Sequence, residues 1–440
     1  MKRLVLLAGA TLVMSSAAKA QDSEVKHNGE FRVRYYNDMV PSGQSSGPQN
    51  KSDIEGRLKL GLTMRKGENL QAHVTLLHGT IFGRDKAAQP TLIEGNSSYS
   101  TPTVDNTVLV NQAYGWWKAG EGFTLKAGRF NVELGNGEFF SADQWRLVPI
   151  THEGFQVGYD TGFAMFNAFL IKDKELTPKN PGSLDSDPEQ HNIILSADLK
   201  NMPEAIKTAN LTLVQISRSE VVGVGSANAQ HAGITLGGDV AGFAYKGVYA
   251  MQMGVEAKTA ALERKLAGSM FDLTVGYGMP ETMGLKIFAN YHSDSGDDPG
   301  TADKNEAYVP LYYDSHRYGG RMDMFGWGNL SYYDVGVAVV PAEDMEVGLT
   351  LFGFSKTKDN GAITFDANRR QTFATVANKS DLGMELDVYA MKKYGPAFQI
   401  DAHLGAFMPG SAMKDGQTTP AVPKMDATIM QLMVMGTMMF

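Results

Sequence analysis

Cysteine is absent from this 440-residue chain, which excludes disulfide bonds and lipid anchoring through a cysteine but remains compatible with export. Beyond its first 14 residues, the chain also lacks an apolar run of the roughly 20 residues that a transmembrane helix needs. Mean hydropathy is only −0.22. These absences exclude a helical membrane bundle. They leave a membrane barrel, in which only alternate residues of each strand meet lipid, or a soluble periplasmic β-protein.

The first twenty residues have the pattern of a secretory signal peptide. Lys2 and Arg3 precede an apolar stretch over 4–14, and small residues then lead to Ala18-Lys19-Ala20. A membrane anchor is the weaker alternative, because so short a stretch does not cross about 30 Å of hydrocarbon. We expect residues 1–20 to be cleaved and residues 21–440 to form a single domain.

Alternation of apolar and polar residues is the main pattern in the rest of the chain. In the first such segment, Phe31, Val33 and Tyr35 alternate with Arg32 and Arg34. Segments of about 10 residues with this period, bounded by turn formers, are typical of strands that cross an outer membrane. They predict an all-β fold: a transmembrane antiparallel β-barrel of about 18 strands, or 16 if one pair is misread. The predicted strands lie near residues 30–36, 54–65, 69–78, 107–118, 122–130, 153–160, 162–171, 191–200, 207–217, 230–239, 241–252, 266–277, 284–293, 328–340, 345–355, 381–391, 396–407 and 427–440.

The links between these segments alternate between short and long. Residues 66–68 and 119–121 form tight turns, whereas the links near 131–152 and 294–327 are long and polar. Because short turns of such barrels face the periplasm and long loops face outward, both termini are expected on the periplasmic side. The last segment keeps its apolar alternation up to Phe440, as expected of a strand that closes a barrel by pairing with the first.

Charged residues on the polar face of each strand are expected to line the lumen. Basic residues gather on the first five strands and acidic residues on the late strands, where His403 lies near Asp401. Opposed walls of this kind set up a transverse field that favours hydrophilic dipolar or charged solutes. For any single residue, an ordinary water-facing position is the alternative. The basic candidates are Arg32, Arg34, Arg57, Lys59, Arg65 and Lys126, and the acidic candidates are Asp272, Asp334, Glu385, Asp387 and Asp401.

The link over 131–152 is richer in aromatic and apolar residues than a solvated loop needs. We expect it to fold into the lumen, where its apolar residues would pack against the wall and its charged residues would narrow the pore. The alternative is a loop that lies over the rim. The apolar residues are Phe139, Phe140, Trp145 and Leu147, and the charged residues are Glu133, Glu138, Asp143 and Arg146.

No motif for catalysis, cofactor binding or nucleic-acid binding is present. The nine histidines are scattered, and Ser315-His316 and His403 near Asp401 are more simply explained as loop or pore residues. The acidic cluster near 294–303 offers oxygen ligands for Ca²⁺ but lacks the spacing of an EF-hand, so we expect a solvated acidic loop. We therefore predict no cofactor and no enzymatic activity.

Six short motifs follow one another along the mature chain. They are Leu109-Val-Asn-Gln-Ala-Tyr-Gly-Trp116, Leu125-Lys-Ala-Gly-Arg-Phe130, Asp143-Gln-Trp-Arg146, Gly154-Phe-Gln-Val-Gly158, Asp381-Leu-Gly-Met-Glu-Leu-Asp387 and Leu404-Gly-Ala-Phe-Met-Pro-Gly410. In order and spacing they resemble the alginate-export type of outer-membrane channel. The resemblance implies an 18-stranded monomeric barrel with an arginine-rich passage for an anionic polysaccharide, in which Arg129 and Arg146 match the basic motif positions. It also implies that Phe440 belongs to the recognition signal of the barrel-assembly machinery.

The mature chain is acidic, which bears on the choice of solute. Without the three basic residues of the signal it has 37 basic against 48 acidic residues, a net charge of −11. We predict an outer-membrane porin for passive diffusion of small hydrophilic solutes or ions through a charged, loop-constricted pore. A channel selective for anionic sugars or polysaccharide is the alternative, and a structural or adhesive barrel is a third. The expected partners are outer-membrane lipid, lipopolysaccharide and the assembly machinery, without nucleic acid; monomer and homotrimer both stay open.

Overall fold

The structure is a computed structural model that describes residues 23–39, 51–82, 108–174, 189–219, 225–258, 263–366, 373, 375–416 and 425–440. The expected signal peptide over 1–20 lies outside the described residues. Parts of several long links, including those after 39 and 82, lie outside them as well.

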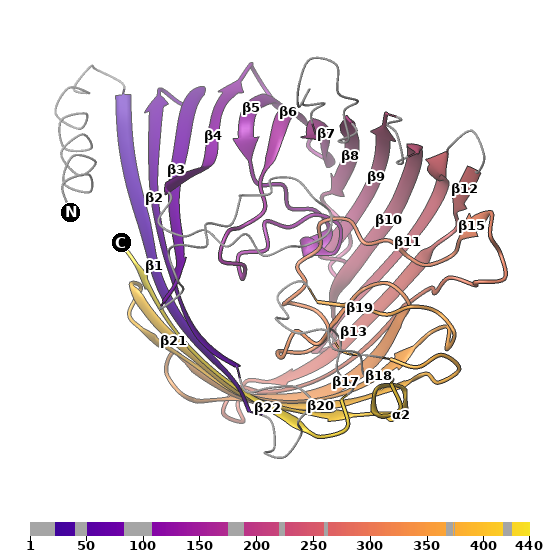
Figure 1. The fold of residues 1–440 in the computed structure, drawn as a ribbon. Coiled ribbons are helices and arrows are strands. Elements are labelled where there is room, and N and C mark those ends of the chain that lie inside the picture. Colours follow the sequence, from indigo (N-terminus) through magenta and orange to yellow (C-terminus); the bar gives the residue numbers. More distant parts are fainter. Residues whose placement is uncertain are drawn as a thin grey trace.

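The wall of the molecule is a closed antiparallel β-barrel (Figure 1). Within the described residues its continuous sheet has 20 strands, of which β12 (Glu263–Leu266) and β15 (Lys304–Asn305) are short pieces of long loops, leaving 18 in the wall. The last strand pairs with the first, which closes the ring. The predicted 18-stranded barrel is therefore confirmed, and the count of 16 is wrong. The wall strands are β1 (Ser23–Met39), β2 (Lys51–Lys66), β3 (Leu70–Ile81), β4 (Val108–Lys118), β5 (Phe123–Phe130), β6 (His152–Asp160), β7 (Ala164–Lys174), β8 (Gln190–Leu199), β9 (Thr208–Arg218), β10 (Ser226–Val240), β11 (Phe243–Lys258), β13 (Ser269–Met279), β14 (Leu285–Asp294), β17 (Leu330–Ala342), β18 (Met345–Lys356), β20 (Asp381–Tyr394), β21 (Phe398–Pro409) and β22 (Ile429–Met439).

Helix is scarce in the described part of the chain. It consists of the 3₁₀ turn η1 (Gly135–Gly137) and the single-turn α2 (Ser411–Lys414), and a small separate sheet pairs β16 (Phe325–Gly326) with β19 (Thr364–Phe365). No helix among the described residues is long and apolar enough to cross a membrane.

Side chains alternate between an outward and an inward face along the wall strands. In β1, Phe31 is 42% exposed, whereas Arg32 and Arg34 on either side of Val33 are only 5% and 3% exposed. Large apolar side chains are exposed on the outer face around the ring, as a lipid-facing belt requires. Phe440 extends the closing ladder, because its backbone exchanges two hydrogen bonds with Gly29. The period-two pattern therefore predicted the orientation of β1 and β22 correctly.

Short and long links alternate around the barrel as predicted, and among the links that the structure describes in full, two long ones fold inward rather than one. We call residues 131–151, between β5 and β6, loop A, and residues 295–329, between β14 and β17, loop B. Figure 1 shows loop A crossing the space enclosed by the strands. The main buried apolar cluster lies inside the barrel, where both loops pack on inward-facing wall residues. Loop A thus fills the lumen as predicted, and loop B is an addition that the sequence did not reveal.

Candidate functional site

The basic wall predicted on the first strands is present on the lumen side of β1 and β2. Arg32 lies opposite Arg57 in the β1–β2 ladder, and Arg34 lies opposite Glu55. The Arg34 guanidinium forms a buried ion pair with Glu55 at 2.6 Å, and Arg57 pairs with Glu30 at 2.6 Å. Ionic partners on the same two strands therefore offset part of the positive charge.

Three arginines of this wall hold the backbone of loop A, and we call Arg32, Arg34 and Arg57 the arginine clamp. Arg32 donates to the carbonyl oxygens of residues 144, 145 and 146 at 2.8–3.0 Å. Arg57 donates to those of 144 and 146 at 2.8 and 2.6 Å, and Arg34 donates to that of 145 at 2.8 Å. Hydrogen bonds from an ionised donor are stronger than neutral ones, so these contacts fix the course of loop A in the lumen. Lys59 adds a bond of 2.7 Å to the side-chain oxygen of Gln144.

Trp145 lies at the centre of the lumen contacts. Its ring stacks on His316 of loop B with centroids 3.4 Å apart and planes 1° from parallel. The Arg34 guanidinium lies 4.2 Å from the centroid of the same ring. Its indole N–H donates to Asp323 at 3.1 Å, and Asp323 also bonds His316 at 2.6 Å. Loops A and B therefore contact each other through this aromatic stack.

The other part of loop A reaches the opposite side of the barrel. Phe139 is buried and packs so closely on β10 that a Cβ atom at Gly233 would come within 2.2 Å of its ring. Glu138 forms an ion pair with Lys246 of β11 at 2.5 Å and accepts a hydrogen bond from Tyr318 at 2.9 Å. Phe140 forms a β-bridge with Tyr312 of loop B. The loop thus spans the lumen between wall strands far apart in the ring.

Loop B is attached to the acidic wall through backbone donors. The N–H of Met322 donates to Glu385 and that of Arg321 donates to Asp387, both at 3.0 Å. Both carboxylates are fully buried on the inward face of β20. Two of the predicted pore acids therefore serve to position loop B.

Burial shifts the titration of several loop residues. Burial, aided by the charge of Asp314, raises the pKa of Asp143 to about 8, and neither carboxylate oxygen of Asp143 has a hydrogen-bond partner among the described residues. Burial also raises the pKa of Glu138, although Lys246 opposes the shift. Burial and the nearby charges of Arg321 and Arg34 hold the pKa of His316 well below its usual range. His316 is therefore neutral near pH 7, which suits its stacking on Trp145.

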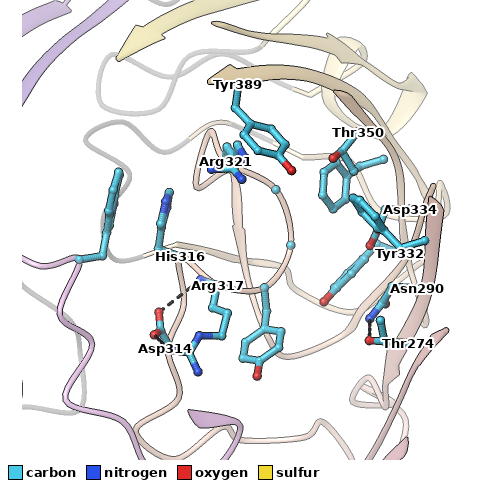
Figure 2. Close-up of a pocket in the computed structure, with 16 residues that line it drawn as sticks. Thr274, Asn290, Asp314, His316, Arg317, Arg321, Tyr332, Asp334, Thr350 and Tyr389 are labelled. Atoms are coloured by element: carbon cyan, nitrogen blue, oxygen red, sulfur yellow. Dashed lines mark hydrogen bonds and ion pairs between the residues drawn. The ribbon is translucent and has the colours of Figure 1, made fainter. Parts of the chain in front are cut away.

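In the part of the chain that the structure describes, two cavities of about 480 Å³ each border this constriction, and Trp145 lines both. The first, which we call the loop-B cavity, lies against β13 to β20 (Figure 2). The second, which we call the clamp cavity, lies against β1, β2, β21 and β22 and reaches the short turn over 395–397. Arg32, Arg57 and Glu30 line the clamp cavity. Trp145 and its partners therefore separate two chambers of the lumen.

Other predicted residues occupy varied positions. Lys126 points inward, with its ammonium about 5 Å from the ring centres of Tyr114 and Phe130. Glu133 accepts from the backbone N–H of Ala142 at 2.7 Å, and Asp401 accepts from Gln399 on its own strand. Within loop A, the positive charge of Arg146 acts on Asp143.

Arg129 does not lie on the basic wall of the lumen. It pairs with Glu153, which shares the outer face of β6 with Phe155, and Phe155 is 55% exposed. Adjacent residues of a strand face opposite sides, so Arg129 faces outward while its buried neighbour Phe130 faces the lumen. The pore-lining role that the resemblance implied for Arg129 is therefore corrected.

Arg317 and Arg321 of loop B were not predicted, yet both line the loop-B cavity. The sequence signal that marks them is the run Ser315-His-Arg-Tyr-Gly-Gly-Arg321, which sets two arginines beside aromatic residues and paired glycines. Gly320 has φ of +99°, so the second glycine adopts a conformation that L side chains rarely take.

Carboxylates of the acidic segment near 294–303, at the end of β14 and the start of loop B, have protein partners. Asp297 pairs with Arg264 at 2.6 Å and Asp294 accepts the backbone N–H groups of Gly328 and Leu330. Among the described residues, no group of three or more His, Asp or Glu side chains is arranged to hold a metal ion.

The closed barrel, its lipid-facing belt and its loop-constricted polar lumen define an outer-membrane channel of the porin class. The sequence pattern of the family described as alginate export matches residues 26–421. The chain belongs to the alginate export family. A search of curated proteins found no match.

Solved structures with the same fold come from Pseudomonas aeruginosa. OccK9 (OpdG) has a TM-score of 0.60 at 11% identity, and the outer membrane protein opdK has 0.59 at 13%. OccK2 (OpdF) in complex with glucuronate has 0.57 at 11%. Each alignment covers 95% of this chain and 98% of the other. At such identities the similarity shows the barrel fold, which is that of outer-membrane porins.

Proposed function

We propose that this channel admits small hydrophilic solutes by passive diffusion and that loops A and B set its size limit around Trp145. The observation that carries the proposal is that Trp145 lines both lumen cavities while the arginine clamp and His316 hold it in place. A solute that passes from one chamber to the other meets this stack. Polar and charged side chains line both chambers, so hydrated solutes are favoured over apolar ones.

Selectivity for anionic sugars or carboxylates is the second candidate. It is supported by Arg32 and Arg57 at the clamp cavity and by Arg317 and Arg321 at the loop-B cavity. A solved relative of the same fold is described in complex with glucuronate, a sugar carboxylate. Asp334 at the loop-B cavity and Glu30 at the clamp cavity argue against a purely anionic passage.

We infer no catalytic role for the histidine beside a serine in loop B. The Ser315 hydroxyl donates to Asp366 at 3.3 Å, whereas His316 bonds Asp323 and stacks on Trp145. A nucleophilic serine needs a base within hydrogen-bond reach. The partner bonds of Ser315 and His316 favour a structural role in the constriction.

Planar-bilayer recording of the purified full-length protein tests the proposed function. We expect discrete conductance steps. Under a KCl gradient, Lys59→Gln should move the reversal potential toward cation preference, and Asp401→Asn should move it toward anion preference. Both shifts should be largest at low salt, where screening is weakest. Absence of conductance from folded, heat-modifiable protein would overturn the proposal. Light scattering of the detergent complex decides between monomer and homotrimer.

A further inference from the structure

We infer that the loop-B cavity is a binding site for small dipolar solutes, which carry an ammonium group and a carboxylate at opposite ends. The inference rests on the proposed channel function and adds the chemical class of solute that the channel binds. The cavity presents an acidic side chain from the wall and a basic side chain from loop B (Figure 2), and neither forms an ion pair with another side chain in the described part of the protein.

Asp334 supplies the negative end. It lies on the inward face of β17, is only 7% exposed, and has no hydrogen bond or ion pair among the described residues. The neighbouring amide of Asn290 donates to Asp272 and Thr274 instead. A carboxylate removed from water without a partner is costly. An ammonium group of a solute in the cavity would supply the missing partner.

Arg321 supplies the positive end. Its guanidinium carbon lies 3.7 Å from the ring centroid of Tyr389, and its backbone N–H donates to Asp387, which fixes the start of the side chain. Arg317 is different, because it pairs with Asp314 and donates to the Asn136 carbonyl. Among the described residues Arg321 forms no ion pair with a carboxylate, so its planar fork of donors can receive one from a solute.

The opposed charges select for a solute that has both. A simple carboxylate at Arg321 would be repelled by Asp334, and a simple amine at Asp334 would be repelled by Arg321. The hydrocarbon between the two groups of a dipolar solute would contact the aromatic rings of Tyr332, Phe288 and Phe352, which line the same cavity. Each part of such a solute therefore meets a matching side chain.

Current block in planar bilayers tests this site. The probes are unbranched ω-amino acids from glycine to 6-aminohexanoate, each compared with the alkyl carboxylate and the alkyl amine of equal length, all at pH 8. We expect at least one amino acid to block at about a tenfold lower concentration than both of its singly charged analogues. Asp334→Asn and Arg321→Gln should each remove that advantage.

Matched controls exclude a general effect of charge removal. Asp239→Asn and Arg264→Gln change the same residue types near the end of β10 and in an outer loop, away from the cavity, and should preserve the advantage. Heat-modifiability on gels checks that each variant folds. If the channel conducts but no amino acid outperforms its analogues, or if both cavity variants keep the advantage, the dipolar site is wrong while the channel function stands. If the protein does not conduct, the proposed function itself fails.

Discussion

Replacing Arg32 by Met should loosen loop A without unfolding the barrel. Arg32 is the member of the arginine clamp whose hydrogen bonds all go to loop A carbonyls, whereas Arg34 and Arg57 also pair with Glu55 and Glu30. Its removal therefore leaves no buried carboxylate without its partner. Methionine keeps an unbranched apolar stem of similar shape against the wall.

The magnitude follows from the three hydrogen bonds lost. Bonds from a charged donor contribute about 1.5–3 kcal/mol each, so the loss of all three would cost at most about 4.5–9 kcal/mol. All three carbonyls keep a second donor from Arg34 or Arg57, and the substitution relieves repulsion among three clustered guanidinium groups. We therefore expect loop docking to weaken by about 2–3 kcal/mol, which raises the released population about 30- to 150-fold.

Single-channel recording measures this change directly. Wild-type protein should show a stable conductance level, and Arg32→Met should add frequent transitions to a higher level as loop A leaves the lumen. Arg65→Met is the matched control, because Arg65 lies on the same face of β2 as Arg57 but donates its hydrogen bond to Gln71 of β3 rather than to loop A. A folded Arg32→Met protein with the conductance and noise of the wild type would refute the role of the clamp in holding loop A.

Three further predictions concern loop A and the barrel end. Because burial raises the pKa of Asp143 to about 8, the docked loop binds more protons than the released loop between about pH 4 and pH 8. Docking should be strongest below that window and weaken across it by about 1.4 kcal/mol per pH unit, so gating noise should rise with pH in wild type and much less in Asp143→Asn. Gly233→Leu should displace Phe139 and raise conductance, whereas Gly247→Leu should not, because a Cβ atom at Gly247 meets open space. Equal conductance of the two variants would contradict the packing of Phe139 on β10. Phe440→Asp should lower the amount of heat-modifiable protein in outer-membrane fractions, because it places a charge at an apolar, exposed position of the closing ladder. Normal amounts of the variant would count against an assembly role for Phe440.

The sequence by itself determined the barrel and the orientation of its wall. A spanning strand meets lipid on one face and the lumen on the other, so the two environments impose a period of two that can be read from segments such as residues 30–36. The number of such segments predicted the strand count, and the alternation of short and long links then distinguished the two ends of the barrel. The apolar content of 131–152 also predicted an inward loop, because Phe139 and Phe140 need a surface on which to pack.

Only the tertiary structure decided how the lumen residues are used. Loop conformation has no period, since it depends on contacts between segments that barrel closure brings together. The sequence therefore indicated that Arg32 faces the pore. It did not indicate that Arg32 donates hydrogen bonds to loop A carbonyls more than 110 positions away. It likewise did not indicate that loop B enters the lumen and sets Arg321 across a cavity from Asp334. The position of loop B follows from packing inside the closed barrel, because its backbone N–H groups donate hydrogen bonds to the buried carboxylates of β20.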